Sequence, residues 1–224
     1  LNGGLGFDTA DYYADAFSSV GAPTQGVVVD LGAGTATDNW GGTDTLNSIE
    51  HVTGSLLADT ISGDLFGNFL MGRDGNDTLD GGLGEDILSG GLGNDDFVLA
   101  EVDAADIITD FELGGDRLDL QALLDANFAS GNQDDYIATR QEGGDTVVSV
   151  DSDGAANGQN FNDVAVLQGV GAGGVIDIVI KECRRDGGIP LRNWDRLARA
   201  AIDANLIENG YIKGDAIEPL PMLR

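Results

Sequence analysis

Several residue types are scarce in this sequence of 224 residues, and each shortage excludes a class of protein or site. Cys183 is the only cysteine, so no internal disulfide can form. His51 is the only histidine, and we find no G-x-S-x-G, H-E-x-x-H or phosphate-loop motif. No apolar run approaches the roughly 18 residues that a membrane-spanning helix needs. We therefore expect neither a catalytic site nor a membrane span in this chain, whatever the activity of its parent protein.

Basic residues are also scarce, and their distribution is uneven. The formal net charge is −28, and Arg73, Arg117 and Arg140 are the only bases before residue 181. Residues 1–180 hold 32 acids against these three bases, a balance of −29, whereas residues 181–224 hold seven acids and eight bases, a balance of +1. We expect neither nucleic acid nor an anionic membrane as a partner, because so much negative charge favours binding of cations. The change in balance predicts a domain boundary at residues 180–181.

Glycine, by contrast, is abundant, and much of it follows a nine-residue register between residues 54 and 98. Each repeat begins with a glycine, has Asp or Asn five residues later, and has an apolar residue two positions further on. The glycines are Gly54, Gly63, Gly72, Gly81 and Gly90; the polar residues are Asp59, Asn68, Asp77, Asp86 and Asp95; the apolar residues are Ile61, Leu70, Leu79, Leu88 and Phe97. An isolated copy occupies residues 3–11 and contains Asp8.

Each position of the repeat has a physical role. Glycine allows positive φ and close backbone approach, so that carbonyl groups can turn toward one point. The aspartate brings a hard anionic oxygen to that point, and the segment that follows has the alternation of a short strand. Oxygen ligands without histidine or cysteine suit Ca²⁺ and not Zn²⁺. The alternative, a flexible linker rich in Gly, Asn and Asp, gives no reason for an apolar residue at every ninth position.

These repeats closely resemble the calcium-binding nonapeptides of RTX proteins. The resemblance implies a parallel β-roll in which two nonapeptides make one turn and residues 18 apart stack. Asp59, Asp77 and Asp95 would then follow one edge, and Asn68 and Asp86 the other. It also implies several Ca²⁺ ions, each held between turns by the pairs Asp59 with Asp77, Asp77 with Asp95, and Asn68 with Asp86. The neutral amide of Asn68 predicts weaker binding at its site.

The resemblance further implies that backbone carbonyl groups and glycines of the loops complete these metal sites. The residues concerned are Gly72, Asp74, Gly75, Asn76, Gly81, Gly82, Leu83, Gly84, Glu85, Gly91 and Gly93. After the last repeat, residues 106–124 are similar to the segment that ends RTX rolls, and Asp106 is the candidate that completes the last site. Asp110 and Asp116 are weaker candidates, for which solvated surface carboxylates are an equal alternative. Asp8 is a further candidate without a clear partner.

The flanking segments complete an all-β prediction. Residues 1–98 are predicted to form the roll, with irregular turns over 12–53 and the regular array over 54–98. Residues 99–180 predict an antiparallel β cap, which resembles the C-terminal target domain of type I secreted proteins. Residues 181–224 form a tail of uncertain origin, in which the apolar stripe of residues 193–210 predicts a short amphipathic helix. In the N-terminal part, His51 is expected to be a half-exposed strand residue.

The sequence therefore predicts a calcium-binding module that folds after export. The resemblance implies a protein secreted by the type I apparatus of a Gram-negative bacterium and located outside the cell or on its surface. Leu1 opens within a motif, so we expect the chain to be part of a longer protein. The alternative is an adhesive or glycan-binding accessory module that binds extracellular polysaccharide. That reading needs an exposed aromatic or basic groove, for which Tyr12, Tyr13 and Trp40 are the nearby candidates, although packing roles are expected for them.

Overall fold

The computed structural model describes residues 1–13, 23–124, 136–154, 160–171 and 176–179, together with two short strands near the C-terminus. These residues form strands, turns and loops and no helix, so the predicted all-β class is confirmed. Within the described segments, no helix is long and apolar enough to cross a membrane.

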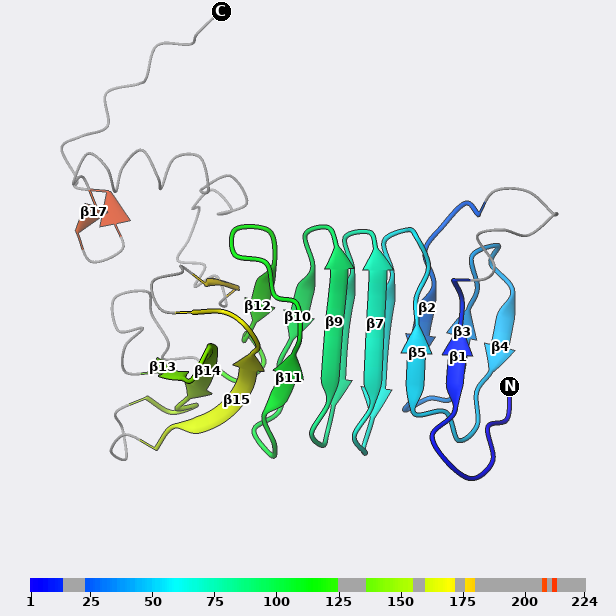
Figure 1. Ribbon diagram of the computed structural model, residues 1–224, viewed down its shortest axis with the longest axis horizontal. Helices are drawn as coiled ribbons and strands as arrows, with labels where there is room; N and C mark the ends of the chain where they lie inside the picture. Colours follow the sequence, from blue (N-terminus) through cyan, green and yellow to red (C-terminus); the bar gives the residue numbers. More distant parts are fainter. Residues whose placement is uncertain are drawn as a thin grey trace, which may run out of the picture.

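The roll consists of two sheets of parallel strands that face each other (Figure 1). Successive strands of the regular array lie alternately in one sheet and in the other. The first sheet contains β1 (Thr9–Asp11), β5 (His51–Thr53), β7 (Phe69–Asp74), β9 (Ile87–Leu92) and β11 (Asp106–Ile108). The second contains β2 (Val28–Asp30), β6 (Thr60–Asp64), β8 (Thr78–Gly82), β10 (Asp96–Val98) and β12 (Arg117–Asp119). Because successive strands from β5 to β12 change sheet each time, the chain winds as a parallel β-roll.

The strand register confirms that two nonapeptides make one turn. In the first sheet Leu70 pairs with Leu88, and in the second Ile61 pairs with Leu79, which pairs in turn with Phe97. Each of these partners is 18 residues away in the sequence. After the array the separation grows, since Leu88 pairs with Ile108. The regular repeat thus fixes the stacking, and the turns beyond it are longer.

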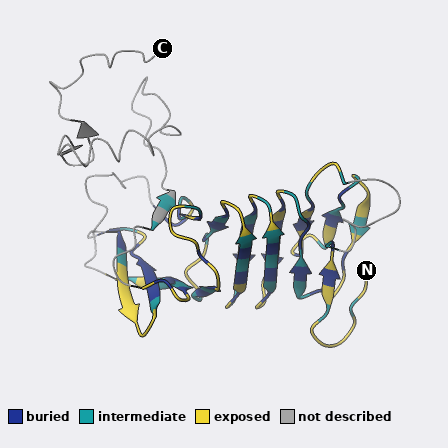
Figure 2. Ribbon diagram, turned by 45° about the horizontal axis from the view of Figure 1, so that its top comes forward, coloured by how far each residue is buried: buried dark blue, intermediate teal, exposed yellow. Residues whose placement is uncertain are grey.

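A single apolar layer fills the space between the two sheets. Strand residues alternate between buried and partly exposed positions, as the dark and light bands of Figure 2 show. The apolar residue of each nonapeptide is fully buried: Ile61, Leu70, Leu79, Leu88 and Phe97 each have 0% exposure. Burial of one such side chain stabilises a fold by about 1.5–3 kcal/mol. Each turn of the array therefore adds only two large core residues, which is a thin core.

The irregular N-terminal segment extends both sheets. β5 pairs in parallel with β7 and with β1, and β2 pairs in parallel with β6. β3 (Thr35–Thr37) and β4 (Thr43–Thr45) then add an antiparallel extension beside β2. The prediction that residues 12–53 continue the roll with irregular turns therefore agrees with the parallel pairing of β5 and β2. It does not cover β3 and β4, which pair antiparallel.

Beyond the array, the parallel sheets continue before the chain turns antiparallel. β11 and β12 extend the two sheets, and β16 (Asp177–Val179) pairs in parallel with β12. The predicted antiparallel cap is formed by β13 (Ile137–Glu142), β14 (Asp145–Val150) and β15 (Asn162–Leu167). Because both sheets cross residue 98 without a break, a domain boundary at that residue stays a prediction.

The predicted helix over residues 193–210 lies outside the described residues except at its end. There the prediction is wrong: β17 (Ile207–Glu208) pairs antiparallel with β18 (Tyr211–Ile212). The sequence between the two strands is Asn-Gly, which favours a two-residue hairpin turn over a helix terminus. The apolar periodicity outweighed this signal in the sequence-based prediction.

Candidate metal sites along the edges of the roll

The residue that immediately precedes each strand lies at an edge of the roll, and these residues form two rows. In β11 the corresponding residue is Asp106, the first residue of the strand. We call edge A the row before the strands of the second sheet and edge B the row before the strands of the first sheet. Edge A contains Asp59, Asp77, Asp95 and Asp116. Edge B contains Asp8, Glu50, Asn68, Asp86 and Asp106. The structure thus brings together residues 18 apart, as the repeat predicts.

Backbone hydrogen bonds connect neighbouring members of each row. On edge A the N–H of Asp59 donates to Oδ1 of Asp77, and the N–H of Asp77 donates to Oδ1 of Asp95, both at 2.8 Å. On edge B the N–H of Asn68 donates to Oδ1 of Asp86 at 2.7 Å. Asp77, Asp86 and Asp95 therefore each bind a backbone N–H of the preceding turn through Oδ1 and leave Oδ2 out of this bond.

The same two bonds recur where the regular array ends. The N–H of Asp95 donates to Oδ1 of Asp116 at 2.9 Å, and the N–H of Asp86 donates to Oδ1 of Asp106 at 3.2 Å. Asp116 and Asp106 therefore continue edges A and B respectively. Asp110 has another role, because it is exposed and accepts the N–H groups of Gly90 and Gly91 at 3.0 Å.

The second carboxylate oxygen is buried and unpaired in the three strongest repeats. Within the described part of the chain, no group donates a hydrogen bond to Oδ2 of Asp77, Asp86 or Asp95. These residues are 1%, 0% and 0% exposed. A buried anionic oxygen without a partner is costly, so each of these positions favours a cation.

The first glycine of the repeat makes room for this oxygen. A β-carbon at Gly72 would clash with Oδ2 of Asp77 and would lie 2.7 Å from the carbonyl oxygen of Gly90 in the next turn. A carboxylate oxygen and a carbonyl oxygen thus approach the same small space from two neighbouring turns. The loop that follows also needs glycine, since Gly75 has a φ of 143°.

The electrostatic environment opposes ionisation of the row carboxylates. Burial, together with the charges of Asp59 and Asp95, raises the pKa of Asp77 to about 7. Burial likewise raises the pKa of Asp86 and of Asp95 to about 6. For Asp106, burial and the charge of Asp86 raise the pKa to about 8. Bringing negative groups together in this way disfavours the charged form unless a cation compensates it.

The bases of the roll are engaged elsewhere. The guanidinium carbon of Arg73 lies 4.0 Å from the ring centroid of Tyr13, in a cation–π contact. Arg117 forms a two-nitrogen ion pair with Asp96 on the outside of the second sheet. Neither base neutralises the buried rows.

The available donors fit calcium. In the described segments, no group of three Asp, Glu, His or Cys side chains converges on one point, so an ion must also take backbone carbonyl oxygens. Ca²⁺ accepts six to eight oxygen ligands of mixed kind, whereas Zn²⁺ prefers nitrogen and sulfur. The side chains of Asp74, Asn76 and Glu85 are exposed and that of Leu83 is half-exposed. The prediction that the carbonyl groups of these residues hold calcium stays a prediction.

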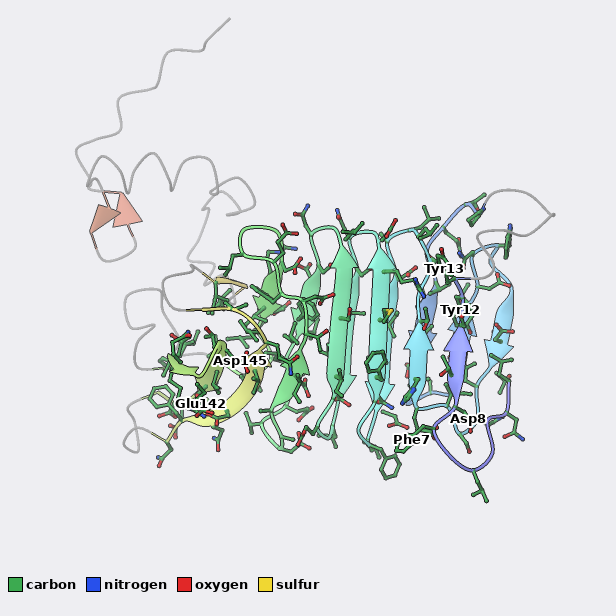
Figure 3. All side chains as sticks on the ribbon, in the orientation of Figure 1. Phe7, Asp8, Tyr12, Tyr13, Glu142 and Asp145 are labelled. Carbon is green, nitrogen blue, oxygen red and sulfur yellow. The ribbon has the colours of Figure 1, made fainter. Side chains whose placement is uncertain are left out.

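Sequence reasoning missed Glu50, which supplies the neighbour that Asp8 lacked. The N–H of Asp8 donates to Oε2 of Glu50 at 3.0 Å, as other row members do with the turn that follows (Figure 3 labels Asp8). Residues 45–53 follow the nonapeptide at its sixth and eighth positions, with Glu50 in place of aspartate and Val52 in the core. The missing first glycine hid this copy. Asp103, which accepts the N–H of Gly84 at 3.0 Å, was also missed.

Comparisons with known proteins agree with this geometry over the array. Residues 62–97 match the model of the RTX calcium-binding nonapeptide repeat, in four copies. A search of curated proteins gave no match to this chain.

Two solved structures from Azotobacter vinelandii are similar to parts of this chain. The AlgE6R3 subunit of a mannuronan C5-epimerase is 27% identical, with a TM-score of 0.34, over 59% of this chain and 83% of that one. The AlgE6R2 subunit is 28% identical, with a TM-score of 0.38, over 55% of this chain and 88% of that one.

Proposed function

We propose that this chain is a calcium-binding module of a type I secreted bacterial protein, and that its roll folds when it meets calcium outside the cell. The observation that carries the proposal is the set of three buried, unpaired carboxylate oxygens on Asp77, Asp86 and Asp95. They lie within the segment that matches the RTX repeat. Asp106 completes edge B beside Asp86 and belongs to the same proposal.

Charge linkage supplies the mechanism. Without calcium, the balance of −29 over residues 1–180 and the thin core leave the roll weakly stable or unfolded. Extracellular modules bind Ca²⁺ in the range of roughly 10⁻⁴–10⁻³ M, well above cytosolic levels. Binding neutralises the rows, and because the site exists only in the folded turns, binding free energy becomes folding free energy. An unfolded chain inside the cell and a folded one outside is the order that one-step export requires.

Calcium titration followed by far-ultraviolet circular dichroism tests the calcium-dependent part of this proposal. We expect a cooperative gain of β signal with Ca²⁺ and none with the same concentrations of Mg²⁺, because Mg²⁺ gives up its water reluctantly and prefers rigid octahedral sites. A β signal that is complete in chelator would contradict it.

Export is tested separately. We expect the chain to reach the medium from Gram-negative cells that carry a type I apparatus and to stay inside when the ATPase of that apparatus is inactivated. Export that is independent of the apparatus would leave a calcium-binding module and remove the type I assignment.

A second candidate function, binding of extracellular polysaccharide, is favoured by one observation. On the outer face of the first sheet, His51 lies half-exposed between Phe7 and Phe69, with ring centroids 5.6 Å apart on both sides. Phe7 is 78% exposed, and Phe66, in the loop that precedes β7, is 71% exposed. Exposed aromatic faces can stack on sugar rings, whereas Tyr12 is buried and donates to Asp44. Retention of the chain on a polysaccharide resin that is lost in Phe7→Ala and Phe66→Ala variants, with calcium binding unchanged, would favour this candidate.

A further inference from the structure

The five loops of the array differ in how they treat the oxygens of their row residue. In loops 72–77, 81–86 and 90–95, Oδ2 of the aspartate has no donor among the described residues. In loops 54–59 and 63–68, hydrogen bonds from the chain itself occupy both functional atoms of the row side chain. We call the first three loops open and the other two sealed.

Ser55 seals loop 54–59. Its N–H donates to Oδ2 of Asp59 at 2.6 Å, and its hydroxyl donates to Oδ1 of Asp59 at 2.7 Å. The N–H of Val27 also donates to Oδ1, at 2.7 Å. Ser55 and Asp59 are buried, with 0% and 2% exposure respectively. Three hydrogen-bond donors therefore compensate the buried charge of Asp59, a role that a cation would have at Asp77.

Asn68 is sealed in the same way on edge B. Its Oδ1 accepts the N–H of Asp64 at 2.8 Å, and its Nδ2 donates to the carbonyl oxygen of Glu50 at 3.2 Å. The amide is neutral, so no charge remains to be compensated. Asp64 occupies the second position of its nonapeptide, as Ser55 does in the preceding one.

The backbone conformation at that second position separates the two kinds of loop. In the open loops the second residue is left-handed, with φ of 89° at Arg73, 88° at Gly82 and 102° at Gly91. Ser55 and Asp64 do not have positive φ. In the sealed loops the second N–H donates to the row side chain, and in the open loops no such bond forms.

The second residue of loop 72–77 is Arg73, so the left-handed conformation at this position does not require glycine. A residue with a β-carbon and a long side chain adopts positive φ only at a cost of the order of 1 kcal/mol. The fold keeps Arg73 in this strained state beside an open aspartate. Such strain is found where a site needs it.

We propose that the second residue of each nonapeptide decides whether its loop can bind calcium, and that the sealed loops 54–59 and 63–68 take no ion. Calcium then binds at the three open loops, between Asp77 and Asp95 and between Asp95 and Asp116 on edge A, and between Asp86 and Asp106 on edge B. The pairs Asp59 with Asp77 and Asn68 with Asp86 hold none. The sealed loops form a metal-independent end against which the calcium-dependent turns stack. This inference rests on the proposed calcium function and adds which turns carry it.

Calcium stoichiometry, measured by equilibrium dialysis and isothermal titration, tests this inference in matched Asp→Asn variants. We expect Asp59→Asn to bind as many ions as the unmodified chain and Asp77→Asn to bind one fewer. Far-ultraviolet circular dichroism at saturating calcium checks that each variant is folded. If Asp59→Asn loses an ion as Asp77→Asn does, the inference is wrong and the proposed function stands. If the unmodified chain binds no calcium, the proposed function itself is wrong.

A second variant tests the role of the second position by gain of a site. Ser55→Gly removes the hydroxyl donor and allows the left-handed conformation, so we expect one additional bound ion. Arg73→Gly is the control, because it keeps loop 72–77 open and relieves strain, and the ion count should not change. No additional ion in a folded Ser55→Gly chain would contradict the assignment of this role to position two.

Discussion

The β-roll and the antiparallel strands β13–β15 compensate their acidic side chains in opposite ways. In the roll, buried aspartates stand near one another, and burial raises the pKa of Asp77 to about 7. In the antiparallel strands, Asp163 accepts hydrogen bonds from two nitrogens of Arg140 and from the Ser149 hydroxyl. Those bonds lower the pKa of Asp163 to about 2. The antiparallel strands thus contain their own cation, Arg140, whereas we propose that the roll takes its cations from solution.

The cores of the two regions differ in the same direction. A strand of the array such as β8 buries one large apolar side chain, Leu79. By contrast β14 buries every residue from Thr146 to Val150, including three valines. The antiparallel strands therefore gain more from apolar burial per strand, and their stability does not depend on neutralising a row of charges. We therefore attribute the proposed calcium dependence to the places where the fold leaves charge uncompensated, and not to net charge alone.

The largest effect is expected from removing both central carboxylates of the rows. The double variant Asp77→Ala with Asp86→Ala should fail to gain β signal at calcium concentrations that fold the unmodified chain, because each edge loses an anionic ligand. Circular dichroism during calcium titration measures this.

The matched control is Asp74→Ala with Glu85→Ala, which removes two exposed acids from the same loops and keeps every backbone carbonyl. It should fold with nearly unchanged calcium dependence. Equal failure of both double variants would mean that bulk charge, and not the buried rows, governs folding.

A core truncation should weaken the roll with its ligands intact. Leu79→Ala removes a fully buried side chain and is expected to cost about 2–5 kcal/mol. Because folding and binding are coupled, the calcium concentration at the folding midpoint should rise. Urea unfolding at saturating calcium measures the loss, and a loss below about 1 kcal/mol would contradict the thin, tightly packed core.

The pH dependence of the calcium-free chain follows from the raised pKa values. Asp77, Asp86, Asp95 and Asp106 have folded pKa values of about 6 to 8 against an ordinary value of 3.8. The folded roll therefore holds protons that the unfolded chain releases, so its calcium-free stability falls as the pH rises from about 4 to 8. In chelator, we expect more β signal at about pH 5 than at pH 8, and weaker calcium binding at pH 5. An increase of calcium-free structure toward pH 8 would contradict the burial of these rows. Asp163, with its lowered pKa, contributes nothing to this change.

The smallest effect is expected in the antiparallel strands. Arg140→Ala breaks an exposed ion pair, which is screened by solvent and contributes little to stability, and should leave the calcium midpoint unchanged. Thermal unfolding and calcium titration of the same variant measure the two quantities. A clear shift of the calcium midpoint would show that the antiparallel strands are coupled to the metal sites.

Much of the roll could be predicted from the sequence because the nonapeptide is a local code. Position six fixes the rows, position eight fixes the core, and the 18-residue turn follows from the repeat. Glu50 escaped prediction because its copy lacks the first glycine, and its place on edge B depends on β5 pairing with β7. The sealed loops escaped it because the decisive contact at Asp59 joins Ser55 and Val27, which are 28 residues apart in the sequence.

The helix predicted over residues 193–210 failed at its end for the opposite reason. Its apolar stripe is a helical signal, but the Asn-Gly pair before Tyr211 is a strong local turn signal that favours the β17–β18 hairpin. Periodicity alone could not decide between the two.

The most direct test of the account is amide hydrogen exchange, resolved by segment, with and without calcium. We predict that β7, β8 and β9 are protected in calcium and exchange rapidly in chelator, while β13 and β14 keep most of their protection in both conditions. Protection of β7–β9 that is the same with and without calcium would contradict the claim that the roll depends on a cation to fold.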